Sequence, residues 1–407
     1  MKQIILVLIS IILGSCQLGT KKENITDDII KIDISKKYPS KKIKINLLDR
    51  EYIPLETNKK ILLGMYATLD YISEKYILIY GDGNIWIFNR KGQIVSHFNH
   101  KGKGPGEYKG IWSVVFDEKK EEIFVFDNYG GDGTGLILVY SIEGKYKRTL
   151  RYPENMALTA YNFDDKTMLV YDTKDLYIMY GNDSPQKTYR TKPYMLLSKA
   201  DGSIVSTLNI DLPDRYPPKL YEQFTAPDGQ LFTSSYNINI NNKRHFGEDF
   251  IISDISSDTI YHLSKNGNLK PFIVRTPSVH STNKPLVCTP IIITEKFIIL
   301  SINTIDYEEA IKLKNSPTKT LMYEFETGEI YDVDYDTYYF DINFMQKNID
   351  ALLVDAWRFK EFFEENYTEK FADSLNNEGK KKFDDWKQIN NNLDDEDNPI
   401  VIIYHFK

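Results

Sequence analysis

The sequence predicts an all-β fold, a six-bladed β-propeller with a small helical insertion near its C-terminus. Short apolar runs alternate like strands and are separated by tight, glycine-containing turns. Turns of one kind recur 52 to 65 residues apart, at Gly92, Gly144, Gly202, Gly267 and Gly328. The interval from Trp112 to Thr159, 47 residues, is the length of one propeller blade, and the longer intervals indicate insertions.

The composition agrees with a large all-β chain. The sequence has 407 residues, of which 42% are hydrophobic, and it holds 29 Tyr and 21 Phe, which are enriched in strands. All-β and repeat architectures of this length often form one unit. The net charge of −7 argues against a nucleic-acid partner.

The first repeat unit is predicted to be a four-stranded meander. Its strand runs are 66–72, 76–80, 85–88 and 94–98. Tight turns at 73–75, at 81–84 and at Lys91-Gly92 connect them.

The stretch 98–108 joins the first unit to the second. It contains Gly102, Gly104, Pro105 and Gly106, which predict a chain reversal of defined shape. Glu107 stands where a dinucleotide fingerprint needs its last glycine, and no Gly-Lys-Ser/Thr follows. We therefore interpret this stretch as a structural turn between two sheets rather than as a nucleotide site.

The next four units follow the same pattern with added segments. Unit two runs from Trp112 to about residue 150, and unit three begins near Thr159 and carries an insertion at 173–192. Unit four has turns at Asp228-Gly229 and Asn266-Gly267 and an insertion at 239–248. Unit five contains the apolar runs 291–293 and 297–302 and the turn at Gly328.

The sixth blade is predicted to combine both ends of the chain. The runs 338–342 and 399–406 supply its inner strands, and 52–56 supplies its outermost strand. An unpaired apolar strand such as 400–403 would be an aggregation hazard, so pairing of the two ends is favoured. Apolar residues at helical spacing, at Ile349, Leu352, Leu353 and Ala356, place a helical insertion at about 345–393.

The N-terminus predicts export. Residues 1–15 combine a short basic start with an apolar run too short to span a bilayer, which is typical of a signal peptide. Residues 16–42 are polar and read as a tether, which leaves 43–407 for the propeller. Of the two cysteines, Cys288 lies before an isoleucine run and is expected in the core rather than as a nucleophile.

Four stretches together resemble a known family. They are Leu13-Gly14-Ser15-Cys16, the opening Ile53-Pro54-Leu55-Glu56-Thr57, the loop from Gly102 to Tyr108, and the ending Asn398-Pro399-Ile400-Val401. This chain resembles exported six-bladed propeller lipoproteins, which are related to NHL-repeat propellers and abundant in Gram-negative anaerobes. The resemblance implies that Cys16 is lipidated and becomes the mature N-terminus. Because Gln17 follows, it further implies a cell-envelope protein on the outer membrane, facing either the periplasm or the surface.

No strong motif for catalysis or metal binding appears. His97 and His100 form an H-x-x-H at a strand end with no nearby third ligand, so a zinc site is weakly indicated. The stretch 127–133 is similar to a calcium loop but has Tyr129 at a ligand position. We therefore predict no cofactor, with calcium left open at that loop. The G-x-S-x-G and H-E-x-x-H signatures are absent from the sequence.

The predicted binding site lies on loops that link one blade's outer strand to the next blade's inner strand, because these loops converge on one face. The loops 101–108, 211–219 and 275–286 supply the candidate ligand-binding residues Lys103, Glu107, Arg215, Tyr216, Arg275 and His280. Aromatic bodies beside charged groups suit a glycan or peptide.

We therefore expect a non-catalytic lipoprotein that binds a glycan, a peptide or an envelope protein at the mouth of the ring. The alternative is a metal-assisted hydrolase, lactonase or lyase whose site lies at the same mouth.

Overall fold

The computed structural model describes most of the chain beyond its N-terminus. The described residues are 29–43, 50–64, 66–127, 135–152, 156–174, 176, 178–179, 189–217, 219–225, 229–237, 243–305, 318–335, 344–346 and 349–406. The predicted signal peptide, Cys16 and the calcium-like stretch 128–133 lie outside these residues.

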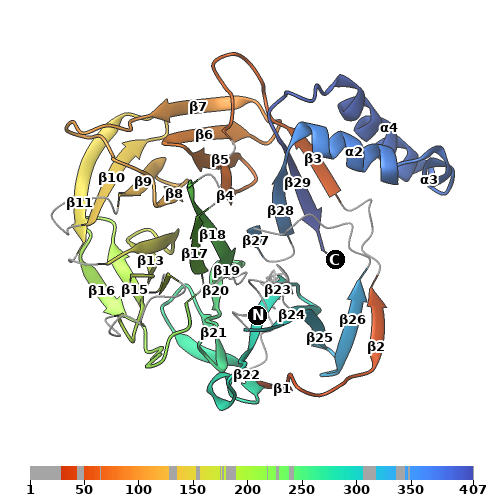
Figure 1. Ribbon diagram of the computed structural model, residues 1–407. Coiled ribbons are helices and arrows are strands. Elements are labelled where there is room, and N and C mark those ends of the chain that lie inside the picture. Colours follow the sequence, from red (N-terminus) through yellow and green to blue (C-terminus); the bar gives the residue numbers. More distant parts are fainter. Residues whose placement is uncertain are drawn as a thin grey trace, which may run out of the picture.

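Six sheets are arranged around a ring (Figure 1), as predicted. Blade one consists of β4 (Thr68–Ile72), β5 (Tyr76–Gly81), β6 (Asn84–Asn89) and β7 (Ile94–Asn99). Blade two consists of β8 (Ser113–Asp117), β9 (Glu122–Asp127), β10 (Gly135–Ser141) and β11 (Tyr146–Tyr152). Blade three consists of β12 (Leu158–Asn162), β13 (Thr167–Asp172), β15 (Tyr194–Ser198) and β16 (Ile204–Thr207). All pairings within these three meanders are antiparallel.

Blades four and five each carry a fifth strand. Blade four consists of β19 (Lys243–Phe246), β20 (Asp249–Ile252), β21 (Thr259–Leu263) and β22 (Leu269–Thr276), and blade five of β23 (Leu286–Ile293), β24 (Phe297–Thr304), β25 (Thr318–Glu324) and β26 (Ile330–Tyr335). The added strands are β1 (Ile30–Asp33), parallel to β22, and β2 (Ser40–Ile43), parallel to β26. Residues 29–43 therefore do not form the tether that their polarity predicted. Ile30, Ile32 and Ile34 alternate with polar residues, and all three are buried.

Blade six closes the ring with strands from both ends of the chain, which confirms the predicted pairing. Its order is β27 (Phe344–Gln346), β28 (Ile349–Val354), β29 (Ile400–His405) and β3 (Arg50–Pro54). One detail differs from the prediction. The segment 349–354 is a strand rather than the start of the helical insertion, because its side chains are covered on both faces and its backbone pairs with β29. The predicted inner strand 338–342 lies outside the described residues.

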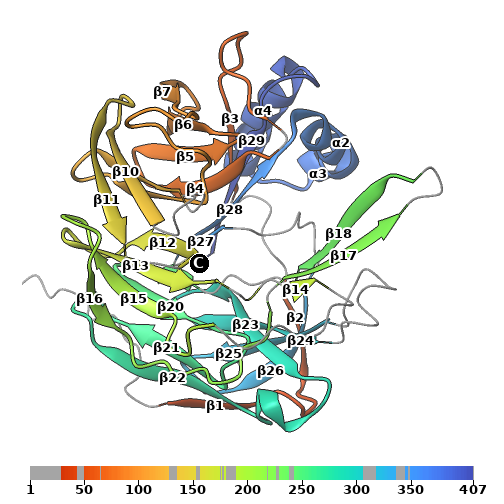
Figure 2. The same ribbon diagram turned by 60° about the vertical axis from the view of Figure 1, so that its left-hand side comes forward.

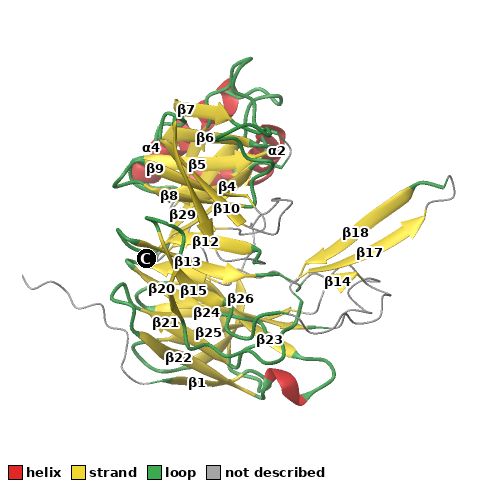
Figure 3. Cartoon of the chain, turned by 90° about the vertical axis from the view of Figure 1, so that its left-hand side faces the viewer, coloured by secondary structure: helices red, strands yellow, loops and turns green. Residues whose placement is uncertain are grey.

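A three-stranded sheet stands apart from the six blades. It consists of β14 (Ile178–Met179), β17 (Lys219–Thr225) and β18 (Leu231–Asn237), and the last two form a hairpin that projects from the ring (Figures 2 and 3). The predicted turn near Gly229 therefore belongs to this hairpin and not to unit four. The segment 239–248, predicted as an insertion, includes β19, the first strand of blade four.

The core lies between neighbouring blades. Strands β5 and β9 are buried along almost their whole length, because each has a blade on either side. The outer strands β7 and β11 alternate between covered and exposed residues. Cys288 is buried between blades four and five, and its burial raises its pKa to about 12, which agrees with the predicted core role.

The insertion between β28 and β29 holds α2 (Ala356–Asn366), α3 (Glu369–Asp373) and α4 (Asn377–Asn392). The side chains of Thr368 and Asn376 cap α3 and α4. Phe359, Phe363 and Trp386 pack with Tyr52 against blade six, so the insertion covers the flank of the closing blade (Figure 1). None of the helices in the described part of the chain is long and apolar enough to cross a membrane.

Candidate functional site

A cavity of about 830 Å³ opens at one end of the ring, among blades one to four. It is lined by the carboxyl-terminal halves of the inner strands β8 and β12 and by the turns that follow them, and by parts of β4, β19 and β20. The loops that arrive from a neighbouring blade enter at the opposite ends of these inner strands. The cavity therefore lies at the other mouth of the ring from the one that the sequence predicted.

Asp70, on the inner strand β4, is the cavity's distinctive polar group. Its side chain is partly accessible from the cavity, and none of the described residues forms a hydrogen bond with its carboxyl. Burial in the ring raises its pKa to about 7. The pKa of Tyr80 is raised as well, chiefly by burial and also by the nearby Asp70 carboxylate and the Tyr161 phenol. Asp70 is therefore a carboxyl group that titrates near neutral pH and remains available to a ligand.

Aromatic side chains form much of the cavity wall. Phe163 and Phe250 pack with ring centres 5.7 Å apart, and His245 lies on Phe250 at 4.4 Å. Burial lowers the pKa of His245 to about 4, so its ring is neutral at pH 7. On the opposite wall, the Tyr71 ring meets Phe116 edge-on at 5.2 Å. Tyr71, Phe163 and His245 are partly exposed and can offer ring faces to a bound group, whereas Phe116 and Phe250 are almost fully buried.

Several other charged groups of the cavity already have partners. Asp117 is paired with the buried Lys199 at 2.6 Å between Oδ2 and Nζ, and Lys199 also donates to Asn162 Oδ1. At the rim, Lys119 pairs with Asp165 at 2.8 Å, Lys265 pairs with Glu248, and Tyr71 donates to Glu118 at 2.8 Å. Asp70 thus differs from its neighbours in having no described partner.

The sequence-predicted residues Lys103 and Glu107 lie apart from this cavity. Lys103 is exposed, and the Glu107 carboxylate accepts a hydrogen bond from the Gly104 N–H at 2.7 Å. Gly106 has φ +74°, which favours glycine, and its carbonyl accepts from Tyr140 at 2.8 Å. Glu107 therefore braces its own loop, which agrees with a structural turn at 98–108.

Arg215, the third predicted residue, is buried and holds main-chain groups together. Its guanidinium donates to the carbonyls of Asp172 at 3.0 Å and Arg190 at 3.2 Å, and it lies 5.0 Å from the centre of the Tyr171 ring. Nearby, the hydroxyl groups of Tyr171 and Tyr194 both donate to the buried Asp254 carboxylate at 3.0 Å. This network joins blades three and four and leaves Arg215 little surface for a ligand.

The structure does bring Tyr216 and His280 together. Their rings are stacked with centres 5.3 Å apart, the Tyr216 N–H donates to Ser256 Oγ, and His280 Nε2 lies 3.0 Å from the Ser256 carbonyl. Arg275 is buried close by, where it pairs with Asp258 at 3.2 Å and donates to the Leu286 carbonyl at 2.5 Å. Tyr216, Arg275 and His280 thus share one region, but their polar atoms connect adjacent loops.

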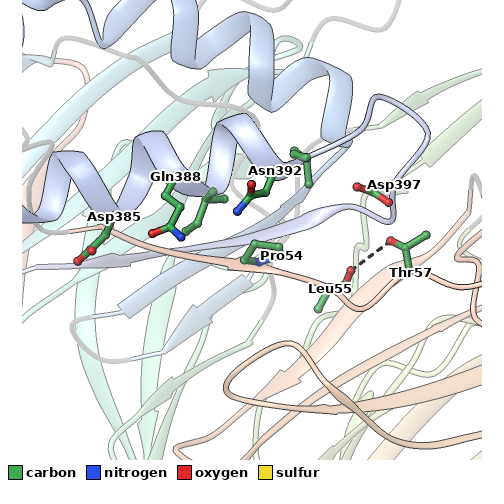
Figure 4. A pocket seen from close by; sticks show the side chains of 9 residues that line it. Pro54, Leu55, Thr57, Asp385, Gln388, Asn392 and Asp397 are labelled. Atoms are coloured by element: carbon green, nitrogen blue, oxygen red, sulfur yellow. Dashed lines mark hydrogen bonds between the residues drawn. The ribbon is translucent and has the colours of Figure 1, made fainter.

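Two other hollows lie elsewhere on the described part of the molecule. One, of about 530 Å³, lies between α4 and the segment after β3, where Asp385, Gln388 and Asn392 face Pro54 and Leu55 (Figure 4). The three side chains on α4 are exposed to solvent, so we interpret this hollow as the seam between the insertion and blade six. The other, of about 670 Å³, lies beside the loop 104–107 and the outer strand β11. Neither contains a buried polar group aimed at a ligand among the described residues.

The two histidines of the H-x-x-H motif do not face a common metal. His97 is stacked on Trp86 and lies 3.0 Å from Asn84 Oδ1, whereas His100 Nε2 lies 2.7 Å from the Gly144 carbonyl. Within the described ranges, no three histidine, cysteine or acidic side chains gather as a metal site would require.

Sequence reasoning missed Asp70 because nothing in its neighbourhood forms a motif. The one available signal was its position, since it is an acidic residue within the predicted inner strand 66–72. Asp is depleted in strands, so an Asp inside a predicted strand is unusual. Only the ring brings this strand to the same cavity as β12 and β19.

One solved structure is similar to this chain along almost its whole length, and two others are similar to a part of it. A protein from Bacteroides fragilis NCTC 9343, described as exported, has a TM-score of 0.56 at 14% identity, and the match covers 93% of this chain and 100% of that one. A protein of unknown function from Bacteroides caccae matches at 12% identity with a TM-score of 0.30, over 63% of this chain and 72% of that one. The extracellular domain of a hybrid two-component system from B. thetaiotaomicron matches at 11% identity with a TM-score of 0.34, over 75% of this chain and 31% of that one.

No protein of curated function matches this sequence. One family model matches residues 29–405, nearly all of the chain that the structure describes. The match begins at β1 and ends in β29, so it includes the added N-terminal strands as well as the closing blade. The chain therefore belongs to the family described as a domain of unknown function, DUF4934.

Proposed function

We propose that this protein is a non-catalytic, ligand-binding lipoprotein of the bacterial cell envelope. Its ligand, a glycan, a peptide or a group on an envelope protein, occupies the 830 Å³ cavity at the carboxyl ends of the inner strands. The observation that carries this proposal is Asp70, a carboxyl group that lines the cavity and has no partner among the described residues.

The arrangement suits binding for a physical reason. Ligand pockets typically combine aromatic walls with a few polar groups that fix orientation. Here the walls include Phe163 from blade three and His245 from blade four, which are both partly exposed and are held in place by the ring. A site built on paired strands loses little conformational entropy when a ligand enters.

The cellular location rests on separate support. The sequence begins with a signal-like run that ends in Leu13-Gly14-Ser15-Cys16, and a structural neighbour is described as exported. We propose that lipid on Cys16 holds the protein on the outer membrane. Cys16→Ala, expressed in a Gram-negative host, should move the protein from the membrane fraction to the soluble fraction. Unchanged fractionation would contradict lipidation.

A glycan and peptide array tests ligand binding. The full-length protein, extracted in detergent, is applied with and without EDTA, which separates direct binding from binding that needs calcium. The strongest array ligand is then titrated against Asp70→Asn and against Asp211→Asn, a matched change at an exposed carboxylate in the loop after β16.

The proposal predicts that Asp70→Asn weakens binding at least tenfold, while Asp211→Asn leaves it unchanged. Equal binding by both variants would place the ligand elsewhere on the molecule. An array on which nothing binds above background would contradict the binding function itself.

A further inference from the structure

We infer that the group bound in the cavity carries a positive charge and is an ammonium centre, either a protonated amine or a quaternary ammonium. This inference rests on the function proposed above and specifies the chemistry of that same site. The groups that matter are the charged and polar side chains of the cavity that have no hydrogen bond or ion pair with another described residue.

The cavity retains acceptors and π faces, and several of its donors already have a partner, although the exposed Lys166 ammonium has none among the described residues. Lys119 is paired with Asp165, Lys265 with Glu248, and the Tyr71 hydroxyl already donates to Glu118. A neutral sugar needs donors as well as acceptors to satisfy its hydroxyl oxygens. The Asp70 carboxyl, in contrast, can accept from a cation directly, so the free groups match a donor that carries positive charge.

The aromatic walls favour the same ligand. A cation over a ring face is attracted by the ring's negative quadrupole, and carboxylates combined with rings form typical ammonium sites. The partly exposed rings of Tyr71 and Phe163 line the cavity and can contribute faces, and the pKa of about 4 leaves His245 neutral, so it does not repel a cation.

The charge balance around the cavity points in the same direction. Its acidic lining residues are Asp70, Asp117, Glu118, Asp164, Asp165 and Glu248, and its lysines are Lys119, Lys166 and Lys265. The other titratable groups that face it or adjoin it are Tyr71, Tyr80, Lys120, Tyr161, Lys199 and His245. Carboxylates exceed cations even when the buried Lys199 is counted, so the field favours entry of a positive ligand.

Binding is expected to depend on pH through Asp70. In the free protein its pKa is about 7, so half of the carboxyl is neutral at that pH. A cation binds the ionised form, so affinity rises about tenfold per pH unit below pH 7 and levels off above it. By the same linkage, a bound cation lowers the pKa of Asp70.

Choline is the probe, because its charge does not titrate, and 3,3-dimethylbutan-1-ol is its neutral isostere. Both are titrated calorimetrically into the full-length protein at pH 5, 6, 7 and 8, and the carboxyl carbon of Asp70 is followed by NMR. We expect choline to bind wild type at least tenfold more tightly than the alcohol at pH 8. Asp70→Asn should remove that difference, and Asp211→Asn should keep it. Saturating choline should lower the pKa of Asp70 by at least one unit.

The outcomes separate the two proposals. If the array ligand is neutral and its binding is lost in Asp70→Asn, while choline does not bind, the cavity is the binding site but the ammonium inference is wrong. If choline binds equally to wild type and Asp70→Asn, the inference is also overturned, because its charge is not recognised by this carboxylate. If neither choline nor any array ligand binds, both proposals fail.

Discussion

At the end of the ring where chain segments arrive from neighbouring blades, Arg215 and Arg275 are buried and donate to main-chain carbonyls. At the opposite end, Asp70 lies beside an 830 Å³ cavity and has no partner among the described residues. The sequence predicted these two arginines as ligand-binding residues, yet in the structure their guanidinium groups hold the loops in place. Asp70, a carboxylate within a strand, was not predicted as a site residue, because the groups around it in the cavity come from other blades.

The largest effect that tests this comparison is expected from Arg215→Ala. The substitution leaves the carbonyls of Asp172 and Arg190 without their donor and the buried Asp254 carboxylate without a nearby cation. Such losses cost about 3–5 kcal/mol of unfolding free energy, measurable by denaturant titration. The control is Arg190→Ala, whose half-exposed side chain pairs with Asp172 at 3.4 Å and should cost less than about 1 kcal/mol. If Arg215→Ala lowers the unfolding free energy no more than Arg190→Ala does, the buried contacts of Arg215 do not stabilise the fold.

Asp70→Asn is expected to act in the opposite direction and stabilise the protein. Because the folded-state pKa is raised from 3.8 to about 7, the ionised carboxylate is disfavoured in the folded state. Wild type therefore loses stability as pH rises from about 4 to 7, whereas the amide does not titrate. The variant should gain about 2–4 kcal/mol at pH 8 and nothing at pH 3.5. Urea titrations at the two pH values provide the test, and a gain independent of pH would contradict the assigned titration.

Gly106→Ala tests whether the loop 102–106 is held by its backbone. Residue 106 has φ +74°, and an added Cβ would lie 2.9 Å from Cγ of Tyr146, so we expect a loss of about 1–3 kcal/mol. Gly104→Ala is the matched control, because the three atoms nearest to its added Cβ belong to the flexible Glu107 side chain, at 3.1 Å and beyond. The melting temperature should fall clearly for the first variant and little for the second. The reverse order would show that the strain lies at residue 104.

The smallest effect is expected from His280→Ala. The histidine stacks on Tyr216 and contacts the Ser256 carbonyl near the surface, so the change should cost about 0.5–1 kcal/mol. Binding of the array ligand should stay within twofold of wild type. A tenfold loss of binding would instead place the ligand at the end of the ring that the sequence predicted.

Much of the ring could be predicted from local pattern. The runs at 76–80, 85–88 and 94–98 have strand composition and are linked in turn by two tight turns, whose glycines, Gly83 and Gly92, take positive φ in the structure. The strand pairing of blade six could also be predicted, because an apolar strand such as 400–403 needs partners and the strand 52–56 had none nearby in sequence. These inferences depend on backbone sterics and on the cost of leaving strands unpaired, both of which are local properties.

The predicted structure was wrong for segments in which long-range strand pairing overrides the local sequence pattern. The segment 349–354 has apolar residues at helical spacing, but β29 supplies a strand partner along its whole length. Residues 29–43 look polar overall, yet the edges of blades four and five pair with them and bury their isoleucines. A weak local preference for helix or coil is overridden when a neighbouring sheet edge can form a full set of backbone hydrogen bonds with the segment.

The sequence by itself determined the blade meander, the closure of the ring by its two ends and the structural chain reversal at the loop 102–106. Only the tertiary structure decided which mouth holds the cavity and which polar groups remain free there. Whether a charged side chain is free depends on every group that packs around it, and those groups come from blades far apart in the chain. Asp70, Phe163 and His245 share one cavity because the ring brings β4, β12 and β19 together, a proximity that no local pattern encodes.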